Sequence, residues 1–385
     1  MAGTTLFSPN KTAFYTARLT DLRGGTVIRP DHVDIHESRC NARCRDCIGH
    51  SGAGAHSINQ KINSENIPVI IDNILAGYGD DIPNIHFAGF TGDPFFGVTE
   101  CGSGTGPSNT AVEGFLHLVR KGIHHAKKAT FVTNGIGLSR HGIGPQGQRS
   151  YSFVELLQLA GAVQVSVDAS CAQQYREYKG VDRFDDVMEN IRSLAFWAKH
   201  AQGMDHNGLF EKLGIQDEWF FPLSPMVLEV NYVLHRGNSE IQDGFIESLE
   251  DMEVDDLRFR TDYFLRDDAD FQARMQDMVA ALQQKYSGIN MDIVMKSPDH
   301  PITAGAFDHC VSPFFWPAVG ADGNVYSCAH TVTPGFAIGS LFERPLLDIL
   351  SDYHDRFAAG DTAESRCQLF CPSWVGRINM LQAGS

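Results

Sequence analysis

The sequence lacks the features that mark several large classes of protein. Its 385 residues contain no apolar run long enough to cross a bilayer, and residues 1–10 lack the basic and apolar segments of a secretory signal. We therefore expect a cytoplasmic protein with no membrane partner. Basic residues are few, because 31 lysines and arginines stand against 47 acidic residues, for a net charge of −16. Such a surface repels a polyanionic backbone, which argues against nucleic acid as a partner.

Cysteine is also scarce, and its distribution excludes a disulfide framework. The nine cysteines gather towards the two ends of the chain, at positions 40, 44, 47, 101, 171, 310, 328, 367 and 371. In a reducing compartment, grouped cysteines bind a metal or a cluster more often than they form disulfides.

Short apolar runs alternate with segments of helical period, which is typical of βα units and a parallel sheet. The predicted strands are residues 32–36, 85–90, 129–133, 163–168, 227–234 and 256–260. The predicted helices are residues 64–76, 110–121, 153–160, 184–200, 239–252 and 269–285. Residues 297–303 break both periods, so we expect a domain boundary near residue 300.

Three cysteines follow the first predicted strand, with the spacing Cys-x3-Cys-x2-Cys at Cys40, Cys44 and Cys47. A [4Fe–4S] cube that is held by three thiolates keeps its fourth iron open to an external ligand. A structural zinc site is the alternative, and it would need a fourth ligand from His36, His50 or a remote residue.

This spacing after a first strand resembles the radical S-adenosylmethionine (SAM) superfamily. The resemblance implies an α/β fold, a partial (β/α)6 barrel over residues 31–300 with an N-terminal extension over residues 1–30. It also implies that SAM binds the open iron and is cleaved to methionine and a 5′-deoxyadenosyl radical, with electrons from a flavodoxin- or ferredoxin-type reductant. One residue departs from the pattern: the position before the third cysteine is usually aromatic in the superfamily and is Asp46 here.

Polar residues at later strand ends extend the resemblance. The segment Thr-Gly-Asp-Pro at 91–94 is similar to the Gly-Gly-Glu-Pro element that holds the SAM ammonium in the family. The third and fourth predicted strands end in polar residues that match positions lining the SAM ribose pocket. The resemblance thus implies cofactor-binding roles for Thr91, Gly92, Asp93, Pro94, Thr133, Asn134, Ser166 and Asp168.

The C-terminal region combines a predicted hairpin with four cysteines. Residues 316–328 are typical of a β-hairpin with Asp322 and Gly323 at its turn. A hairpin that presents thiolates, followed by a cysteine pair, resembles the auxiliary-cluster domains called SPASM and, in shortened form, twitch. The resemblance implies such a domain over residues 301–385, with a second [4Fe–4S] cluster. Its ligands would be Cys310, Cys328, Cys367 and Cys371, and the same four thiolates could instead hold a structural zinc ion.

The twitch-like form resembles enzymes that tailor sugars and aminoglycosides in antibiotic biosynthesis. The resemblance implies a small sugar-containing substrate, a sugar or aminocyclitol that loses hydrogen from a carbinol carbon. Epimerisation is favoured, with Cys101 or Cys171 returning the hydrogen, because each follows a strand end that should face the site; a small buried hydrophobe is the alternative role for each. Three other functions stay open: a dehydrogenase that passes an electron to the auxiliary cluster, a peptide-modifying SPASM enzyme and a non-catalytic iron–sulfur electron carrier.

Two arginines on the sixth predicted strand are a further candidate. Arg258 and Arg260 are two residues apart, so they share one face of the strand. If that face points inward, a guanidinium could hold a hydroxyl, carboxylate or phosphate, and a structural ion pair is the alternative.

Overall fold

The computed structural model describes most of the chain, in two compact units. The described residues are 9–45, 47, 60–88, 92–96, 110–122, 128–138, 141–143, 150–200, 207–213, 225–262, 265, 268–294, 310–333, 335–359 and 378. Unit 1 comprises Met1–Ser38, Gly52–His86 and Ser297–Ser385, and unit 2 comprises Arg39–Ser51 and Phe87–Lys296. The domain limits expected from the sequence, 1–30, 31–300 and 301–385, are not decided by this division and stay a prediction. Over the described part of the chain, the helices are too short or too polar to cross a membrane.

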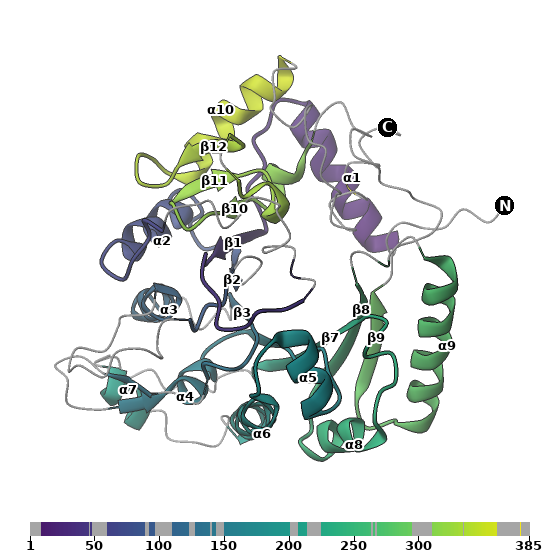
Figure 1. Ribbon diagram of the computed structural model, residues 1–385. Helices are drawn as coiled ribbons and strands as arrows, with labels where there is room; N and C mark the ends of the chain where they lie inside the picture. Colours follow the sequence, from purple (N-terminus) through teal and green to yellow (C-terminus); the bar gives the residue numbers. More distant parts are fainter. Residues whose placement is uncertain are drawn as a thin grey trace. The chain divides into compact units, whose positions relative to one another are not determined.

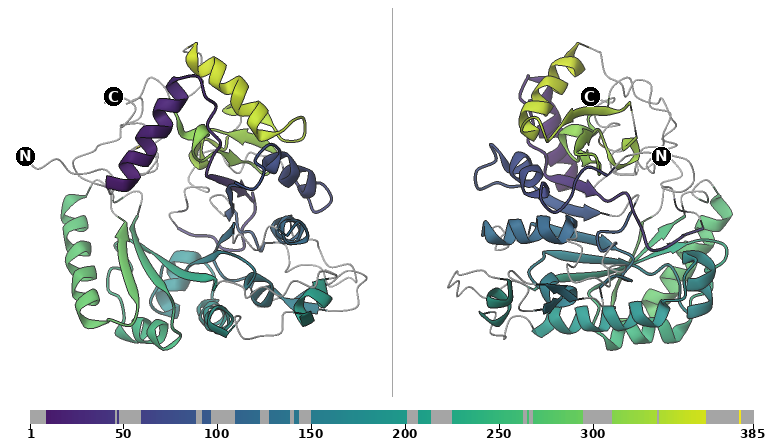
Figure 2. Two further views of the ribbon diagram at one scale, coloured as in Figure 1. Left: turned by 180° about the vertical axis from the view of Figure 1, so that it is seen from behind. Right: turned by 60° about the vertical axis from the view of Figure 1, so that its left-hand side comes forward.

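Unit 2 is built on a parallel sheet with the strand order β3-β6-β7-β8-β9. Its strands are β3 (Ala129–Thr133), β6 (Ala162–Ser166), β7 (Val227–Leu234), β8 (Asp256–Thr261) and β9 (Asn290–Val294). Parallel neighbours require long crossover connections, and helices supply them here. The helices are α3 (Thr110–Arg120), α4 (Phe153–Leu157), α5 (Ala172–Lys179), α6 (Phe184–His200), α7 (Asn207–Leu213), α8 (Asp243–Asp251) and α9 (Ala269–Lys285). In Figure 1 and Figure 2, α8 and α9 flank the strands β7 to β9. A short antiparallel pair, β4 (His141–Ile143) and β5 (Ser150–Ser152), follows β3.

The core of unit 2 lies between the sheet and these helices. On β7, Leu228, Val230 and Tyr232 are fully buried. The Tyr232 ring packs 5.9 Å from Phe245 of α8 and 5.7 Å from Phe259 of β8, measured between ring centroids. Successive side chains of a strand point to opposite faces, so the intervening residues of β7 face away from the helices.

Local capping explains where two of these helices begin. Ser152 Oγ accepts a hydrogen bond from Glu155 N at 3.0 Å at the start of α4. At the start of α9, Asp268 Oδ1 accepts from Phe271 N, also at 3.0 Å. Side-chain acceptors of this kind satisfy backbone N–H groups that have no partner within the helix.

Unit 1 carries the C-terminal hairpin. Its strand order is β12-β11-β10-β1, with β1 parallel to β10 and the other neighbours antiparallel. Its elements are α1 (Pro9–Arg23), β1 (His32–His36), α2 (Ile67–Leu75), β10 (Ala318–Val319), β11 (Asn324–Tyr326), β12 (Ala337–Ser340) and α10 (Leu346–Ala358). Strand β2 (Asn84–Ala88) is where the chain passes from unit 1 into unit 2. Gly323, at φ +79°, forms the turn between β10 and β11, so the hairpin expected from the sequence is confirmed.

A buried carboxyl on β1 makes the stability of unit 1 depend on pH. Asp34 Oδ1 accepts from Trp316 Nε1 at 2.5 Å and lies 3.4 Å from His86 Nδ1. Burial raises the pKa of Asp34 to about 7, and the hydrogen bond from Trp316 lowers it by less. The native state therefore holds this proton more tightly than the unfolded chain, where the pKa is about 4. The resulting stabilisation is complete below about pH 4 and is lost as the pH rises through about 7.

We expect Asp34→Asn to remove this pH dependence, because an amide copies the neutral carboxyl. Relative to Asp34→Asn, the wild-type free energy of unfolding should fall by about 4 kcal/mol between pH 4 and pH 8. Denaturant unfolding at both pH values measures this difference, and Asp352→Asn, at an exposed ion pair with Arg344, is the control. A difference between wild type and Asp34→Asn that is equal at both pH values would contradict the assignment.

Candidate functional site

The cysteine loop belongs to unit 2 and is fastened to the last turn of α5. Arg43 N donates to Lys179 O and Arg45 N donates to Tyr178 O, each at 2.8 Å. Gly180 ends α5 at φ +69°. A Cβ at this glycine would lie 3.0 Å from Arg43 O, so the close approach of loop and helix depends on its absence. The loop is therefore held by backbone contacts that leave its cysteine side chains available.

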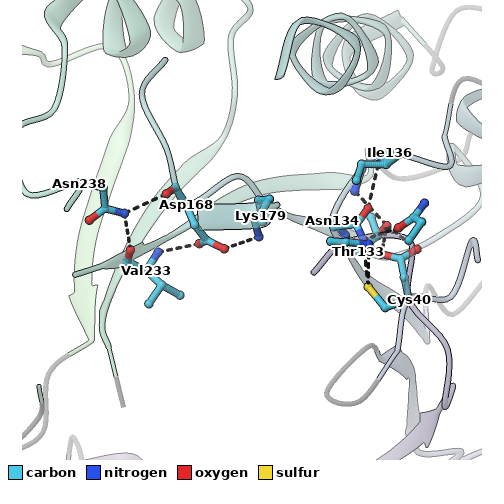
Figure 3. Close-up of polar contacts among 12 residues, drawn as sticks. Cys40, Thr133, Asn134, Ile136, Asp168, Lys179, Val233 and Asn238 are labelled. Carbon is cyan, nitrogen blue, oxygen red and sulfur yellow. Dashed lines mark hydrogen bonds and ion pairs between the residues drawn. The ribbon is translucent and has the colours of Figure 1, made fainter. Parts of the chain in front are cut away.

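Cys40, Cys44 and Cys47 are free thiols that are each partly exposed. Cys40 Sγ accepts hydrogen bonds from Ala42 N and from Asn134 Nδ2, both at 3.4 Å (Figure 3). Asn134 Nδ2 also donates to Asn41 Oδ1 at 2.7 Å, which fixes the amide against the loop. Hydrogen bonds directed at sulfur are among the contacts that orient and tune iron–sulfur ligands.

Ionisation of these thiols at neutral pH requires a positive charge close to the sulfur atoms. Burial raises the pKa of Cys40 to about 12, and the nearby Asp93 charge adds to the effect. Burial also raises the pKa of Cys44, while the Lys179 ammonium acts in the opposite direction on both thiols. A coordinated metal deprotonates its thiol outright, so this donor set fits an iron–sulfur cluster.

A zinc ion at this loop would need a fourth ligand, and His50, one of the expected candidates, lies outside the described residues. Over that part of the chain, no three His, Cys, Asp or Glu side chains form a group that could hold one ion. The cysteines of a cluster bind separate irons, so their sulfurs need not converge on one point. A zinc ion at the cysteine loop therefore stays an alternative.

Asp93 joins the second strand-end segment to the end of β3. The carboxylate is buried, and its Oδ2 accepts from Thr133 Oγ1 at 2.9 Å and from Asn134 N at 2.7 Å. Its Oδ1 accepts from Phe95 N at 2.9 Å. Burial raises the pKa of Asp93, and these hydrogen bonds lower it by less. The structure thus brings together Asp93, Thr133 and Asn134, three of the predicted cofactor residues, beside Cys40.

The tight turn after β3 depends on Gly137. A Cβ there would lie 2.6 Å from Phe95 Cβ and 2.7 Å from Phe95 O, closer than side chains approach one another. The missing side chain therefore allows residues 134–138 to pack directly on the segment that carries Asp93.

Asp168 and Lys179 form a buried ion pair just beyond the end of β6 (Figure 3). Their side chains are 5% and 3% exposed. Asp168 has φ +56°, a left-handed conformation that is uncommon outside glycine, and its Oδ1 accepts from Val233 N at 2.7 Å. Asn238 Nδ2 donates to Asp168 O at 2.8 Å and to Val233 O at 2.7 Å, so this amide fixes the strand ends around the pair.

Lys179 is a residue of this candidate site that was not predicted from the sequence. Burial acts against its ammonium, but the charges of Asp168 and Cys44 outweigh burial and raise the pKa of Lys179. Its positive charge lowers the pKa of Cys40, Cys44 and Asp93. The buried ammonium of Lys179 therefore acts both on the cysteine loop and on Asp93. The sequence did contain one signal for this helix end: Lys179 is followed by Gly180, and a basic residue before a glycine is typical of the last turn of a helix.

The other predicted residues are distributed as follows. Gly92 and Pro94 are buried beside Asp93, and Ser166 ends β6. Cys171 is a partly exposed free thiol at the N-terminus of α5. The positions that lie outside the described residues are Thr91, Cys101, Cys367 and Cys371.

In unit 1, Cys310 and Cys328 lie on either side of the hairpin. Cys310 O accepts from Tyr353 OH at 3.4 Å, and buried Cys328 donates its N–H to Thr331 Oγ1 at 3.0 Å. Because half of the predicted ligand set falls outside the described residues, the auxiliary cluster stays a prediction.

Comparison with known proteins identifies a fold rather than a sequence family. No family model matches the chain, and no curated protein matches its sequence. Streptococcus suis SuiB bound to precursor peptide SuiA aligns with a TM-score of 0.56 and 12% identity, over 96% of this chain and 78% of that one. SuiB bound to S-adenosylmethionine aligns with a TM-score of 0.55 and 13% identity, over the same shares. The chain has the SuiB fold. The predicted α/β class, with a largely parallel sheet and a C-terminal antiparallel hairpin, is thereby confirmed.

Proposed function

We propose that this chain is a radical SAM enzyme that binds a [4Fe–4S] cluster through Cys40, Cys44 and Cys47. The main observation is the cysteine loop itself, which is bonded through Cys40 to Asn134 at the end of β3 and through its backbone to α5. Parallel α/β folds bind ligands at the carboxyl ends of their strands, where this loop lies. The shared fold supports the proposal, because SuiB has been crystallised with SAM bound.

In this proposal the protein positions the cofactors and supplies the electrostatic environment. A [4Fe–4S] cluster held by these cysteines would pass one electron from a reductant to SAM, which would then be cleaved to methionine and a 5′-deoxyadenosyl radical. Asn134 orients the Cys40 sulfur, and Asp93 holds the turn that carries Asn134. Lys179 offsets part of the negative charge of the thiolates. We further propose SAM contacts for the other predicted strand-end residues, including Ser166, and an auxiliary cluster in residues 301–385.

The direct test is SAM cleavage. Anaerobically reconstituted protein that is given SAM and dithionite should release 5′-deoxyadenosine, whereas protein without reductant should not. Absence of this product from protein with a full complement of iron would overturn the proposal and would favour an electron carrier.

We further propose that the enzyme abstracts hydrogen from a carbinol carbon of a sugar-containing substrate and epimerises that carbon. Cys171, a free and partly exposed thiol just beyond the end of β6, supports this outcome as a candidate hydrogen donor. Its thiyl radical would return to the thiol by taking one electron from the reductant and one proton from solvent. A thiol exchanges its hydrogen with solvent, so the product formed in deuterium oxide should gain one mass unit at the reacting carbon. A dehydrogenase would instead yield a ketone two mass units lighter. If neither Cys171→Ala nor Cys101→Ala reduces deuterium incorporation, the thiol is not the donor.

A peptide substrate is the second candidate. SuiB has been crystallised with precursor peptide SuiA, and the fold match covers 96% of this chain. A modified peptide after incubation with SAM, reductant and candidate peptides would replace the sugar proposal and leave the SAM chemistry intact.

A further inference from the structure

The polar face of β7 and β8 is a feature that cluster and SAM binding do not explain. Leu228, Val230 and Tyr232 face the helices, so the alternate residues Glu229 and Asn231 point to the opposite side of the sheet. Strand β8 repeats the pattern. Leu257 and Phe259 are buried on the helix side, and Arg258 and Arg260 point to the opposite side. Four polar side chains thus lie on one face of two neighbouring strands, and any of them that is buried costs free energy unless it is hydrogen-bonded.

Strand register places this face beside the candidate site. Ser166 of β6 pairs with Asn231 of β7, and Asn231 pairs with Arg258 of β8. Arg260 lies one pleat further along, in register with Val233, whose N–H bonds to Asp168. The polar face is therefore continuous with the strand ends that carry the predicted cofactor residues.

The two arginines have different partners. Arg258 Nη1 lies 2.7 Å from Glu229 Oε2, and the Glu229 side chain is 5% exposed. Burial raises the pKa of Glu229, while the charges of Arg258 and Arg260 lower it. Arg258 and Glu229 therefore form a structural ion pair.

Arg260 forms no ion pair with any of the described residues. Its side chain is exposed to solvent, yet desolvation by surrounding protein atoms lowers its pKa. Two further carboxylates share the face, Asp256 in register with Glu229 and Asp292 in register with Arg258. Both lie nearer the amino ends of the strands than Arg260, whereas the carboxylates of Glu229 and Asp168 act on the guanidinium and raise its pKa.

Asn231 supplies an independent observation. The residue is 4% exposed; its amide is placed to hydrogen-bond the Glu229 carboxylate, and none of the described residues donates to its Oδ1. A buried acceptor of this kind costs about 1–3 kcal/mol unless a donor reaches it. Asn231 lies on the same face, between Ser166 and Arg258, so a donor from a molecule bound there would satisfy it.

We infer that Arg260 and Asn231 recognise a substrate that carries an oxyanion, a carboxylate or a phosphate, next to an O–H or N–H donor. A planar guanidinium binds two oxygens of such a group at once, and Asn231 Oδ1 accepts from the neighbouring donor. This inference rests on the proposed function for its claim that the ligand is the substrate. It narrows the substrate to an acidic or phosphorylated sugar, or to the acidic side chain of a peptide, and disfavours a cationic amino sugar.

Equilibrium binding to the reconstituted full-length protein, without SAM or reductant, tests the site. The probes are glucuronate, glucose 6-phosphate, glucosamine, glucose and an acetylated Glu-Glu-Gly amide. We expect at least one anionic probe to bind about tenfold more tightly than its neutral or cationic counterpart. Whether the anionic sugars or the acidic peptide bind more tightly shows which class of molecule carries the anion. Arg260→Gln should abolish this preference, and the control Arg236→Gln, at an exposed ion pair with Asp268, should keep it.

Two results would overturn the inference: no anion preference in the wild type, or a preference that survives in Arg260→Gln. Asn231→Leu provides a second variant, which should weaken binding of hydroxylated anions more than binding of acetate. Because no step of this assay requires SAM cleavage, its failure is distinguishable from failure of the radical SAM proposal.

Discussion

Cys44→Ala is expected to remove about four iron atoms per chain and to reduce 5′-deoxyadenosine formation to background. A cube that loses one of three protein thiolates has two irons without protein ligands, which destabilises the cluster. The backbone of the loop should survive, because Arg43 and Arg45 bind α5 through main-chain atoms rather than through the cysteine. Iron analysis and the nucleoside assay measure both effects.

Cys171→Ala is the matched control for iron content. Cys171 is also a partly exposed free thiol in unit 2, but it lies at the start of α5, away from the loop sequence. The Cys171→Ala variant should contain as much iron as the wild type. Equal iron in the wild type and in Cys44→Ala would show that the loop binds no cluster.

Lys179→Met is expected to lower the free energy of unfolding by about 3–5 kcal/mol. The substitution keeps the volume of the side chain but leaves the Asp168 carboxylate buried without its cation. Removing one partner of a buried pair costs far more than removing one partner of an exposed pair. Denaturant unfolding measures the loss.

Two further variants separate the buried charge from other effects. Lys199→Met disrupts a half-exposed pair with Asp255 and should cost about 1 kcal/mol or less. Lys179→Met combined with Asp168→Asn should recover part of the loss, because asparagine accepts the left-handed φ and carries no charge. A loss in Lys179→Met no larger than that in Lys199→Met would contradict the buried pair.

Elements with strong periodicity could be predicted from the sequence. Strand β7 and helices α6 and α9 have the predicted bounds, because β-branched residues or an amphipathic repeat mark them over eight to seventeen residues. Helix α5 was missed because its eight residues are mostly polar and its buried face consists of Tyr175, Tyr178 and Lys179. Strand β9 was missed because five residues are too few to show a period.

Cysteine spacing and the ends of the predicted strands were enough to predict part of the candidate site. Cys40, Asp93 and Asn134 were all singled out, but the sulfur contact of Asn134 depends on two segments that are distant in sequence. The ion pair of Asp168 with Lys179 could not be predicted, since nothing in a sequence shows that a lysine is buried. For the two arginines, the ion-pair alternative is confirmed for Arg258, whereas Arg260 has no ion pair with the described residues and its ligand-binding role stays a proposal.

The most direct test of the central claim is electron paramagnetic resonance of the anaerobically reconstituted, reduced protein before and after SAM is added. If Cys40, Cys44 and Cys47 hold a cluster with one open iron, the signal of a reduced [4Fe–4S] centre should change when SAM binds, and Cys44→Ala should lose that response. An identical spectrum with and without SAM, or zinc in place of iron at this loop, would contradict it.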